Sequence, residues 1–378
     1  MKKSIAKLFG ILAISGVVLT SCSSSDDDEP TSSFQLVPSN FKGDINDGQV
    51  ILNASTVYTL TGRLVVNEGA ELVIPAGTVI EATGGTSSYI AVAQGGKISI
   101  NGTSTNPVVM TASQKEPGAW GGLVVCGKAP INKGETATAE VSDLTYGGNV
   151  ANDNSGVIRY LRVEYSGAAF NSEKEFNGVS FFGVGSGTTV EYVQVHEGSD
   201  DGFEFFGGTV NTKYLVSTSN EDDQFDWTEG WSGTNENWFG KLGLGRGNRG
   251  IEADNNSSNH VATPISNPSI KNLTLIGLGD QGTESQAIKL RVGTKAVFDN
   301  VVLNNFLIGF DVQHDESISY IADGTLKATN VKFDNIITLK AKYNPASLTE
   351  IYAENSSATG AGNGTSVPAW AQGWTVGL

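Results

Sequence analysis

The segment GSDDGFEFFGG at residues 198–208 is followed by NEDDQFDWTEG at residues 220–230, which repeats its pattern. In both copies a pair of aspartates precedes a phenylalanine, and an acidic residue follows that phenylalanine. The step from Asp201 to Asp223 is also the step between the two phenylalanines and between the two acids after them. A fixed step between two acidic copies indicates stacked repeats, or an ion site that neighbouring repeats share.

Looser copies of this unit occur on both sides of the acidic pair. Each unit contains two short strands with alternating or β-branched residues, and Gly, Asn or Pro separates the strands. No segment after residue 22 has a sustained helical period of apolar residues. Repeats of this length and composition are typical of a solenoid. The further copies are at 156–167, 250–260, 268–294, 295–313 and 324–341.

Aligned in this way, the units place an apolar column beside a polar one. Because neighbours on a strand point to opposite faces, we expect the apolar column inside and the polar column outside. This arrangement predicts an all-β fold, a right-handed parallel β-helix of roughly a dozen coils with loop excursions. The apolar column holds Phe203, Phe225, Ile251, Ile288 and Phe310. The polar column holds Glu204, Asp226, Glu252, Lys289 and Asp311.

The composition agrees with this fold class. The chain has 378 residues, of which 47 are glycine and 17% are charged, and its formal net charge is −16. Low charge with many Gly, Thr, Val and Asn residues is typical of all-β proteins. The negative charge argues against nucleic acid as a partner, because phosphate binding requires a basic surface. Cys126 lies in the apolar run GGLVVCG and is expected to be a buried, unreactive thiol.

The amino terminus has the features of an export signal. Three lysines precede an apolar stretch that is short for a membrane span, and the segment ends in LTSC at 19–22. These four residues resemble a bacterial lipobox, which implies cleavage before Cys22 and lipidation of Cys22. We predict a lipoprotein signal peptide at 1–21, a lipidated, acidic, flexible tether at 22–45 and the β-helix at 46–378. The expected location is the outer membrane, with the lipid as membrane anchor and the protein exposed at the cell surface.

The acids of the doubled pattern are candidates for a metal or ligand site. Like charges one strand spacing apart repel, so compensation is required. Water and salt could screen the charges, carboxyls could be protonated with a raised pKa, or Ca²⁺ could bridge them with six to eight oxygen ligands. A catalytic version of the site would use Lys289 and Arg291 as basic partners. The candidate residues are Asp200, Asp201, Glu204, Asp222, Asp223 and Asp226.

Aromatic residues suggest a second kind of contact. Trp227, Trp231 and Trp238 lie close together in the sequence, and exposed tryptophan faces stack on sugar rings. The alternative is a packed loop that covers the side of the solenoid. The Gly-rich segment at 240–250 is expected to be a mobile excursion that carries Arg246 and Arg249.

A longer part of the chain is similar to a known family. The sequences SGVIRYLRVEYSG at 155–167, NGVSFFGVGSGTTVEYVQVHEGSDDGFEFFGG at 177–208 and DDQFDWTEGW at 222–231 resemble β-helical cell-surface lipoproteins of the Gram-negative outer membrane. The resemblance covers about residues 45–378, including PAWAQGWTVG near the C-terminal end. It implies the fold and an anchored surface location. The family is largely uncharacterised, so the resemblance implies no activity.

Three functions are compatible with these features. The first is binding of glycans or other surface ligands by an outer-membrane lipoprotein, assisted by Ca²⁺. The second is cleavage of an acidic polysaccharide by a polysaccharide lyase or glycoside hydrolase, since glycosidases use paired carboxyl groups. The third is a structural adhesin or spacer without a small ligand. The sequence favours the first, because no complete set of hydrolase or lyase motifs is present.

Overall fold

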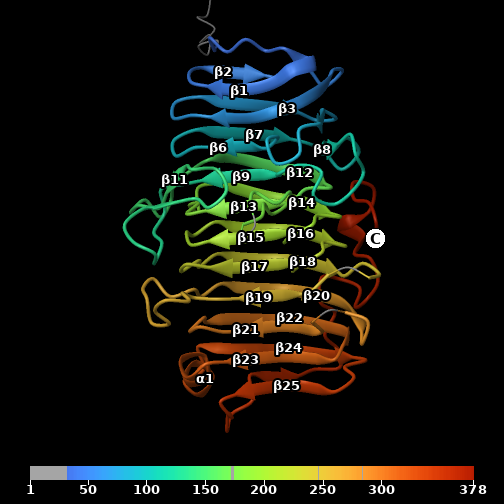
Figure 1. Cartoon of the computed structure of the whole chain (residues 1–378). Helices are drawn as coiled ribbons and strands as arrows, with labels where there is room; N and C mark the ends of the chain where they lie inside the picture. Colours follow the sequence, from blue (N-terminus) through green and yellow to red (C-terminus); the bar gives the residue numbers. More distant parts are fainter. Residues whose placement is uncertain (1–31, 172–173, 246, 283) are drawn as a thin grey trace, which may run out of the picture.

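The computed structural model describes residues 32–171, 174–245, 247–282 and 284–378. It is a stack of short parallel strands wound into a solenoid, as Figure 1 shows. In this part of the chain 24 strands form one sheet, and a separate two-stranded hairpin lies beside it. The predicted all-β parallel β-helix is confirmed. The predicted signal peptide at 1–21 and the lipidation site Cys22 lie outside the described residues.

Each coil contributes one strand to each of two series. The first series is β1 (Phe41–Ile45), β3 (Val57–Val66), β6 (Ile90–Val92), β9 (Leu123–Cys126), β13 (Val179–Phe182), β15 (Phe203–Phe206), β17 (Phe225–Thr228), β19 (Ile251–Ala253), β21 (Gln286–Leu290), β23 (Ile308–Gln313) and β25 (Leu339–Asn344). The second series is β2 (Gln49–Ile51), β4 (Glu71–Pro75), β7 (Lys97–Asn101), β12 (Gly156–Glu164), β14 (Thr189–His196), β16 (Asn211–Thr218), β18 (Thr234–Lys241), β20 (Ser269–Gly279), β22 (Ala296–Phe306), β24 (Leu326–Asp334) and β26 (Tyr352–Glu354).

The remaining elements complete the stack. In the first coils β5 (Val79–Ala82) and β8 (Val108–Ala112) form a third side. The hairpin consists of β10 (Ala137–Thr138) and β11 (Thr145–Tyr146). The helices are η1 (Pro38–Asn40), α1 (Asp315–Ala322) and η2 (Ala369–Ala371). None of the helices within the described ranges has the length and apolar character needed to cross a membrane.

The solenoid begins earlier than the sequence suggested. Strand β1 starts at Phe41 and pairs in parallel with β3. Phe34 packs edge-on against Phe41, with ring centroids 6.4 Å apart. The predicted boundary between tether and β-helix at residues 45 and 46 is therefore wrong, because the first strand of the stack lies on the tether side of it.

The long strands bend at a column of residues in the left-handed backbone region. This bend divides the strands of the second series from β12 to β24 into two sides of the coil. Asparagine tolerates this conformation better than most residues, and Asn272 donates to Asn237 at 3.0 Å and accepts from Asn300 at 2.8 Å. The side chains thus form a hydrogen-bonded ladder along the bend. The column is Tyr160, Tyr192, Tyr214, Asn237, Asn272, Asn300 and Asn330, with φ between 50° and 62°.

The interior matches the apolar column predicted from the sequence. All of its residues are 0% exposed, and Phe203 stacks on Phe225 with ring centroids 5.7 Å apart. Cys126 is also 0% exposed, which confirms its predicted burial, and burial raises the pKa of its thiol. The strands pair in the aligned register across the column: Phe203, Phe225, Ile251, Ile288 and Phe310.

The C-terminal segment, residues 355–378, returns along the bent strands. It is drawn in red at the right of Figure 1. Trp374 is fully buried and packs edge-on against Tyr160 and Tyr192. Gln194 accepts the Val376 N–H at 2.9 Å. The segment therefore ties neighbouring coils together.

The three tryptophans predicted to stack on sugars lie in the core. Trp227, Trp231 and Trp238 are each 0% exposed. Trp231 stacks on Phe205 with ring centroids 4.0 Å apart, and its indole N–H donates to the Val210 carbonyl. A fully covered ring offers no face to a sugar. The prediction of glycan stacking is therefore wrong, and these residues fill the interior.

Substitution of a core tryptophan should destabilise the solenoid strongly. We expect Trp231→Ala to lower the free energy of unfolding by about 3–5 kcal/mol, because it removes a fully buried indole and leaves a cavity. Urea unfolding followed by circular dichroism measures this loss. Trp370→Ala, which truncates a half-buried ring on the C-terminal segment, should cost less. A wild-type urea midpoint for Trp231→Ala would contradict the core assignment.

Candidate functional site

The acids of the doubled pattern lie in one row on the first strand series. Glu204 is opposite Asp226, and Asp226 is opposite Glu252 in the next coil. The row continues through Lys289 and Asp311 in the register predicted from the sequence. Strand alternation keeps these side chains out of the apolar core, but they are not freely solvated. Glu204 and Asp226 are half-buried, and Asp311 is 1% exposed.

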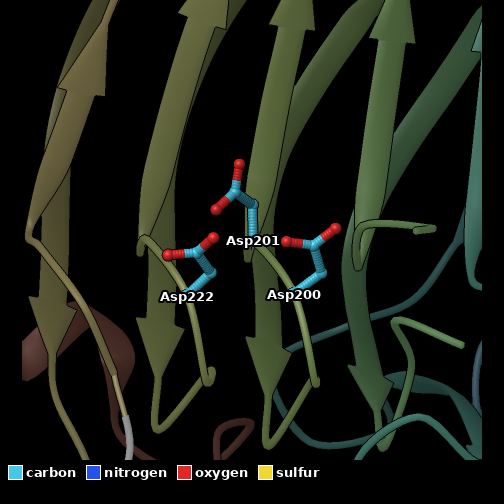
Figure 2. A group of neighbouring side chains, drawn as sticks. All are labelled: Asp200, Asp201 and Asp222. Carbon is cyan, nitrogen blue, oxygen red and sulfur yellow. The ribbon is translucent and has the colours of Figure 1, made fainter. Parts of the chain in front are cut away.

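The turns before these strands add the aspartate pairs. Figure 2 shows Asp200, Asp201 and Asp222 grouped on two neighbouring coils. One carboxylate oxygen of each lies within 4.8 Å of those of the other two. Two further groups with the same spacing follow along the row and share Asp201 and Asp226 with their neighbours. All six acids predicted as ligands are thus brought together in what we call the acidic cluster: Asp200, Asp201, Glu204, Asp222, Asp223 and Asp226.

Hydrogen bonds between coils explain why the second aspartate of each pair is repeated. Asp201 Oδ1 accepts the backbone N–H of Asp223 at 2.9 Å. Asp223 Oδ1 accepts the backbone N–H of Arg249 at 2.7 Å, one coil further. Each of these carboxylates therefore fixes the turn of the next coil. The repeat could be predicted from the sequence. The sequence did not reveal that one oxygen of each carboxylate accepts a backbone N–H of the next coil.

Two segments outside the repeat extend the acidic cluster. Asn177 donates to Glu204 at 2.6 Å from the loop before β13. Glu140, on the excursion that carries β10 and β11, adds its charge near Glu204 and raises the pKa of that carboxyl, which desolvation already raises. Glu175 lies close enough to Asp200 to have the same effect. These residues were missed because excursions have no period that an alignment of repeats can reveal.

Arg249 neutralises the part of the row that follows the acidic cluster. Its guanidinium lies 3.3 Å from Asp223 Oδ2 and 2.7 Å from Glu252 Oε1. It also pairs with Glu284. Arg249 is only 5% exposed. The expectation of a mobile excursion is thus wrong for Arg249, because its charge is required inside a group of acids. Arg246 lies outside the described residues.

Lys289 and Arg291, which the sequence suggested as basic partners of a catalytic site, continue the compensation. Lys289 lies 3.4 Å from Glu252, and Arg291 pairs with Glu252 and, at 2.7 Å, with Asp254. These cations are therefore engaged by acids of the same row. Among the described residues the row therefore has two halves. The acidic half has no ion pair with a lysine or arginine and consists of Asp200, Asp201, Glu204, Asp222 and Asp226. The mixed half combines acids with bases and runs from Asp223 through Glu252 to Lys289.

Burial and mutual repulsion raise the pKa values of the carboxyls in the acidic half. Desolvation, followed by the charges of Asp222 and Glu175, raises the pKa of Asp200 to about 7. Desolvation is also the main cause that raises the pKa values of Asp201, Glu204 and Asp226 well above their usual range. The neighbouring acids add to each of these shifts.

The geometry of the acidic cluster suits two kinds of chemistry, cation binding and proton transfer. Several carboxylate oxygens within reach of one another suit a hard divalent cation such as Ca²⁺, which prefers oxygen ligands. Carboxyls with raised pKa values beside ionised acids can donate or accept protons near neutral pH. Both uses require solvent access, and the half-buried Asp200, Glu204, Asp222 and Asp226 retain some.

Removal of Arg249 tests the compensation in the mixed half. We expect Arg249→Met to lower the free energy of unfolding by about 3–5 kcal/mol at pH 7, because Asp223 and Glu252 lose a buried partner. The loss should shrink towards pH 4, where protonation removes the unpaired charges. Urea unfolding at both pH values measures the effect. Arg63→Met, which breaks an exposed pair with Asp44, is the control and should cost less than about 1 kcal/mol. Equal losses in the two variants would contradict the role of Arg249.

Comparison with known proteins agrees with the fold. A search of curated proteins finds no similar one. The family model of the pectate-lyase-like β-helix domain matches residues 43–375, nearly the whole of the described solenoid. The chain therefore belongs to the family of pectate-lyase-like β-helix domains.

Proposed function

We propose that this protein binds a glycan on the outer face of its first strand series, with Ca²⁺ held by the acidic cluster. The observation that carries the proposal is the uncompensated charge of that cluster. Within the described ranges, no lysine or arginine forms an ion pair with five of its members: Asp200, Asp201, Glu204, Asp222 and Asp226.

The physical argument is the cost of gathering these charges. Two unit charges 4 Å apart repel by about 4 kcal/mol near a protein surface. The mixed half of the row avoids this cost with Arg249, Lys289 and Arg291, whereas the acidic half has only protons or a bound cation to offset it. A cation that binds there also presents positive charge to solvent, which attracts the carboxylates or hydroxyls of a polysaccharide. Membership of a pectate-lyase-like family supports a carbohydrate as ligand.

Calcium should stabilise the protein in a pH-dependent way. A carboxyl whose pKa is higher in the folded state than in the unfolded state destabilises the fold as pH rises between those two values. For Asp200, with a folded-state pKa of about 7, the window is about pH 4 to 7. The metal-free protein should therefore lose stability across this window. At pH 7 calcium at 100 times its dissociation constant should restore about 2.7 kcal/mol, and near pH 4 it should add little.

Thermal unfolding with calcium or EDTA at pH 4 and pH 7 measures this effect, and titration calorimetry measures the affinity. Asp226→Asn should weaken calcium binding, because Asp226 belongs to two of the three ligand groups. Asp334→Asn, which changes a half-buried acid 3.9 Å from Lys332 and outside the acidic cluster, is the matched control. Calcium affinity that is the same in wild type and Asp226→Asn would exclude the acidic cluster as the cation site.

A second candidate function is cleavage of an acidic polysaccharide by a lyase or hydrolase. It is favoured by the contrast between neighbouring carboxyls: desolvation and Glu204 raise the pKa of Asp226, while Glu252 is held by three cations. Such a contrast separates a proton donor from a proton acceptor. Incubation with neutral and uronic-acid polysaccharides, with calcium or EDTA, distinguishes the two functions. New reducing ends would identify an enzyme, and binding without cleavage would identify a binding protein.

We also propose that the protein is anchored in the outer membrane and faces the cell surface. The support is the sequence at 1–30, where a lipobox-like LTSC precedes an acidic segment. Several acyl chains hold a protein on a membrane more firmly than one. Labelling of growing cells with a fatty acid should mark the wild-type protein and not Cys22→Ala. Protease added to intact cells should digest the anchored protein if it faces outward. Label on Cys22→Ala would exclude this anchor.

A further inference from the structure

A polar pocket lies at the far end of β17 from the acidic turns. Its volume is about 330 Å³. Glu229 follows directly after β17, three residues beyond Asp226 of the acidic cluster. In an extended strand this step corresponds to about 10 Å, so one oligosaccharide could contact both places. The residues that matter for the argument are Asn132, Lys133, Glu229, Ser257, Ser258 and Asn259.

The pocket is held open by contacts between two segments that are far apart in the sequence. Asn132 lies on the excursion after β9, and its side chain donates to Asn255 Oδ1 at 2.8 Å. Its own Oδ1 accepts from Asn256 at 3.0 Å, and its backbone N–H donates to the Glu229 carbonyl at 2.9 Å. These hydrogen bonds fix the excursion to the loop after β19. The pocket is therefore formed before any ligand binds, which lowers the entropic cost of binding.

The two charged side chains that line the pocket, Lys133 and Glu229, have opposite signs and form an ion pair. Glu229 is 7% exposed, lies 2.9 Å from Lys133 Nζ and accepts the Tyr146 hydroxyl at 2.5 Å. The other groups are amides and hydroxyls. A cation would find the Glu229 carboxylate already paired, and an anion would be repelled by the acids of the neighbouring row. The remaining ligand class is neutral and rich in hydrogen-bonding groups.

Several of these groups still have hydrogen-bonding capacity. Ser257, Ser258 and Asn259 are exposed at the rim. In the part of the chain that the structure describes, the hydroxyls of Ser257 and Ser258 form no hydrogen bond with protein. Each hydroxyl can both donate and accept, as the hydroxyl groups of a sugar do. Such a rim suits a sugar ring better than a purely apolar ligand.

We propose that this pocket binds a neutral sugar residue of the glycan. The inference rests on the proposed function, glycan binding, and adds a place and a chemical class to it. The glycan is then a chain with a neutral residue at the pocket and a cation-binding or acidic residue towards the acidic cluster. The pocket itself requires no Ca²⁺.

Titration calorimetry with the mature chain tests the proposal. The probes are neutral oligosaccharides and oligouronates of equal length, each measured in EDTA so that no cation takes part. We expect neutral oligosaccharides to bind and Ser258→Leu to weaken their binding by about tenfold or more, because the added side chain blocks the rim and removes a hydroxyl. Ser357→Leu is the matched control. Ser357 is also exposed, and both serines donate their backbone N–H to an asparagine Oδ1 two residues earlier.

The possible results separate the pocket from the calcium site. Neutral binding that survives Asp226→Asn but not Ser258→Leu supports the pocket even if calcium binding fails. No binding of any neutral oligosaccharide, or equal binding by wild type and Ser258→Leu, overturns it. Oligouronate binding in EDTA that Ser258→Leu abolishes also overturns it, because the ligand class would then be acidic. Equal thermal midpoints for both leucine variants exclude loss of the fold as the cause.

Discussion

Coils of a parallel β-helix stack about 4.8 Å apart, so every side chain lies beside its counterparts in the coils before and after it. This spacing is the constraint on which the rest of the structure depends. It makes ladders of like residues stable when they are apolar, as with Phe203 and Phe225, or when they form hydrogen bonds, as with Asn237 and Asn272. The same spacing makes a ladder of carboxylates unstable unless something offsets its charge.

The carboxylate charges in the row through Glu204 are offset in two different ways. In one half Arg249, Lys289 and Arg291 are placed among the acids, and the charges are offset within the protein. In the other half the acids depend on protons or on an external cation. Asp201 and Asp223 are needed for the turn hydrogen bonds, but Asp226 has no such backbone role among the described contacts. Solubility alone does not explain half-buried acids, because full exposure would serve it better.

Sequence reasoning predicted what the repeat determines and failed where the repeat is interrupted. The columns of Phe203 and Glu204 could be predicted because alternation and a fixed period define both face and register. The orientation of Trp231 could not, since closely spaced aromatics occur equally in cores and on binding faces. Arg249 was misjudged because flanking glycines are typical of loops, whereas its guanidinium is buried among Asp223, Glu252 and Glu284. Glu140 belongs to an excursion without a period, so only the fold reveals its position.

The difference between the repeated coils and the excursions that interrupt them also affects how a ligand would be recognised. The stack repeats its chemistry from coil to coil, so by itself it can provide charge but little selectivity. Selectivity requires groups that occur once, and the excursion after β9 and the loop after β19 supply them around Glu229. Asp226 and Glu229 lie on and directly after the same strand, β17, which is paired on both sides and rigid. A glycan that touches both would therefore couple cation binding to sugar binding through its own contacts, without a conformational change in the solenoid.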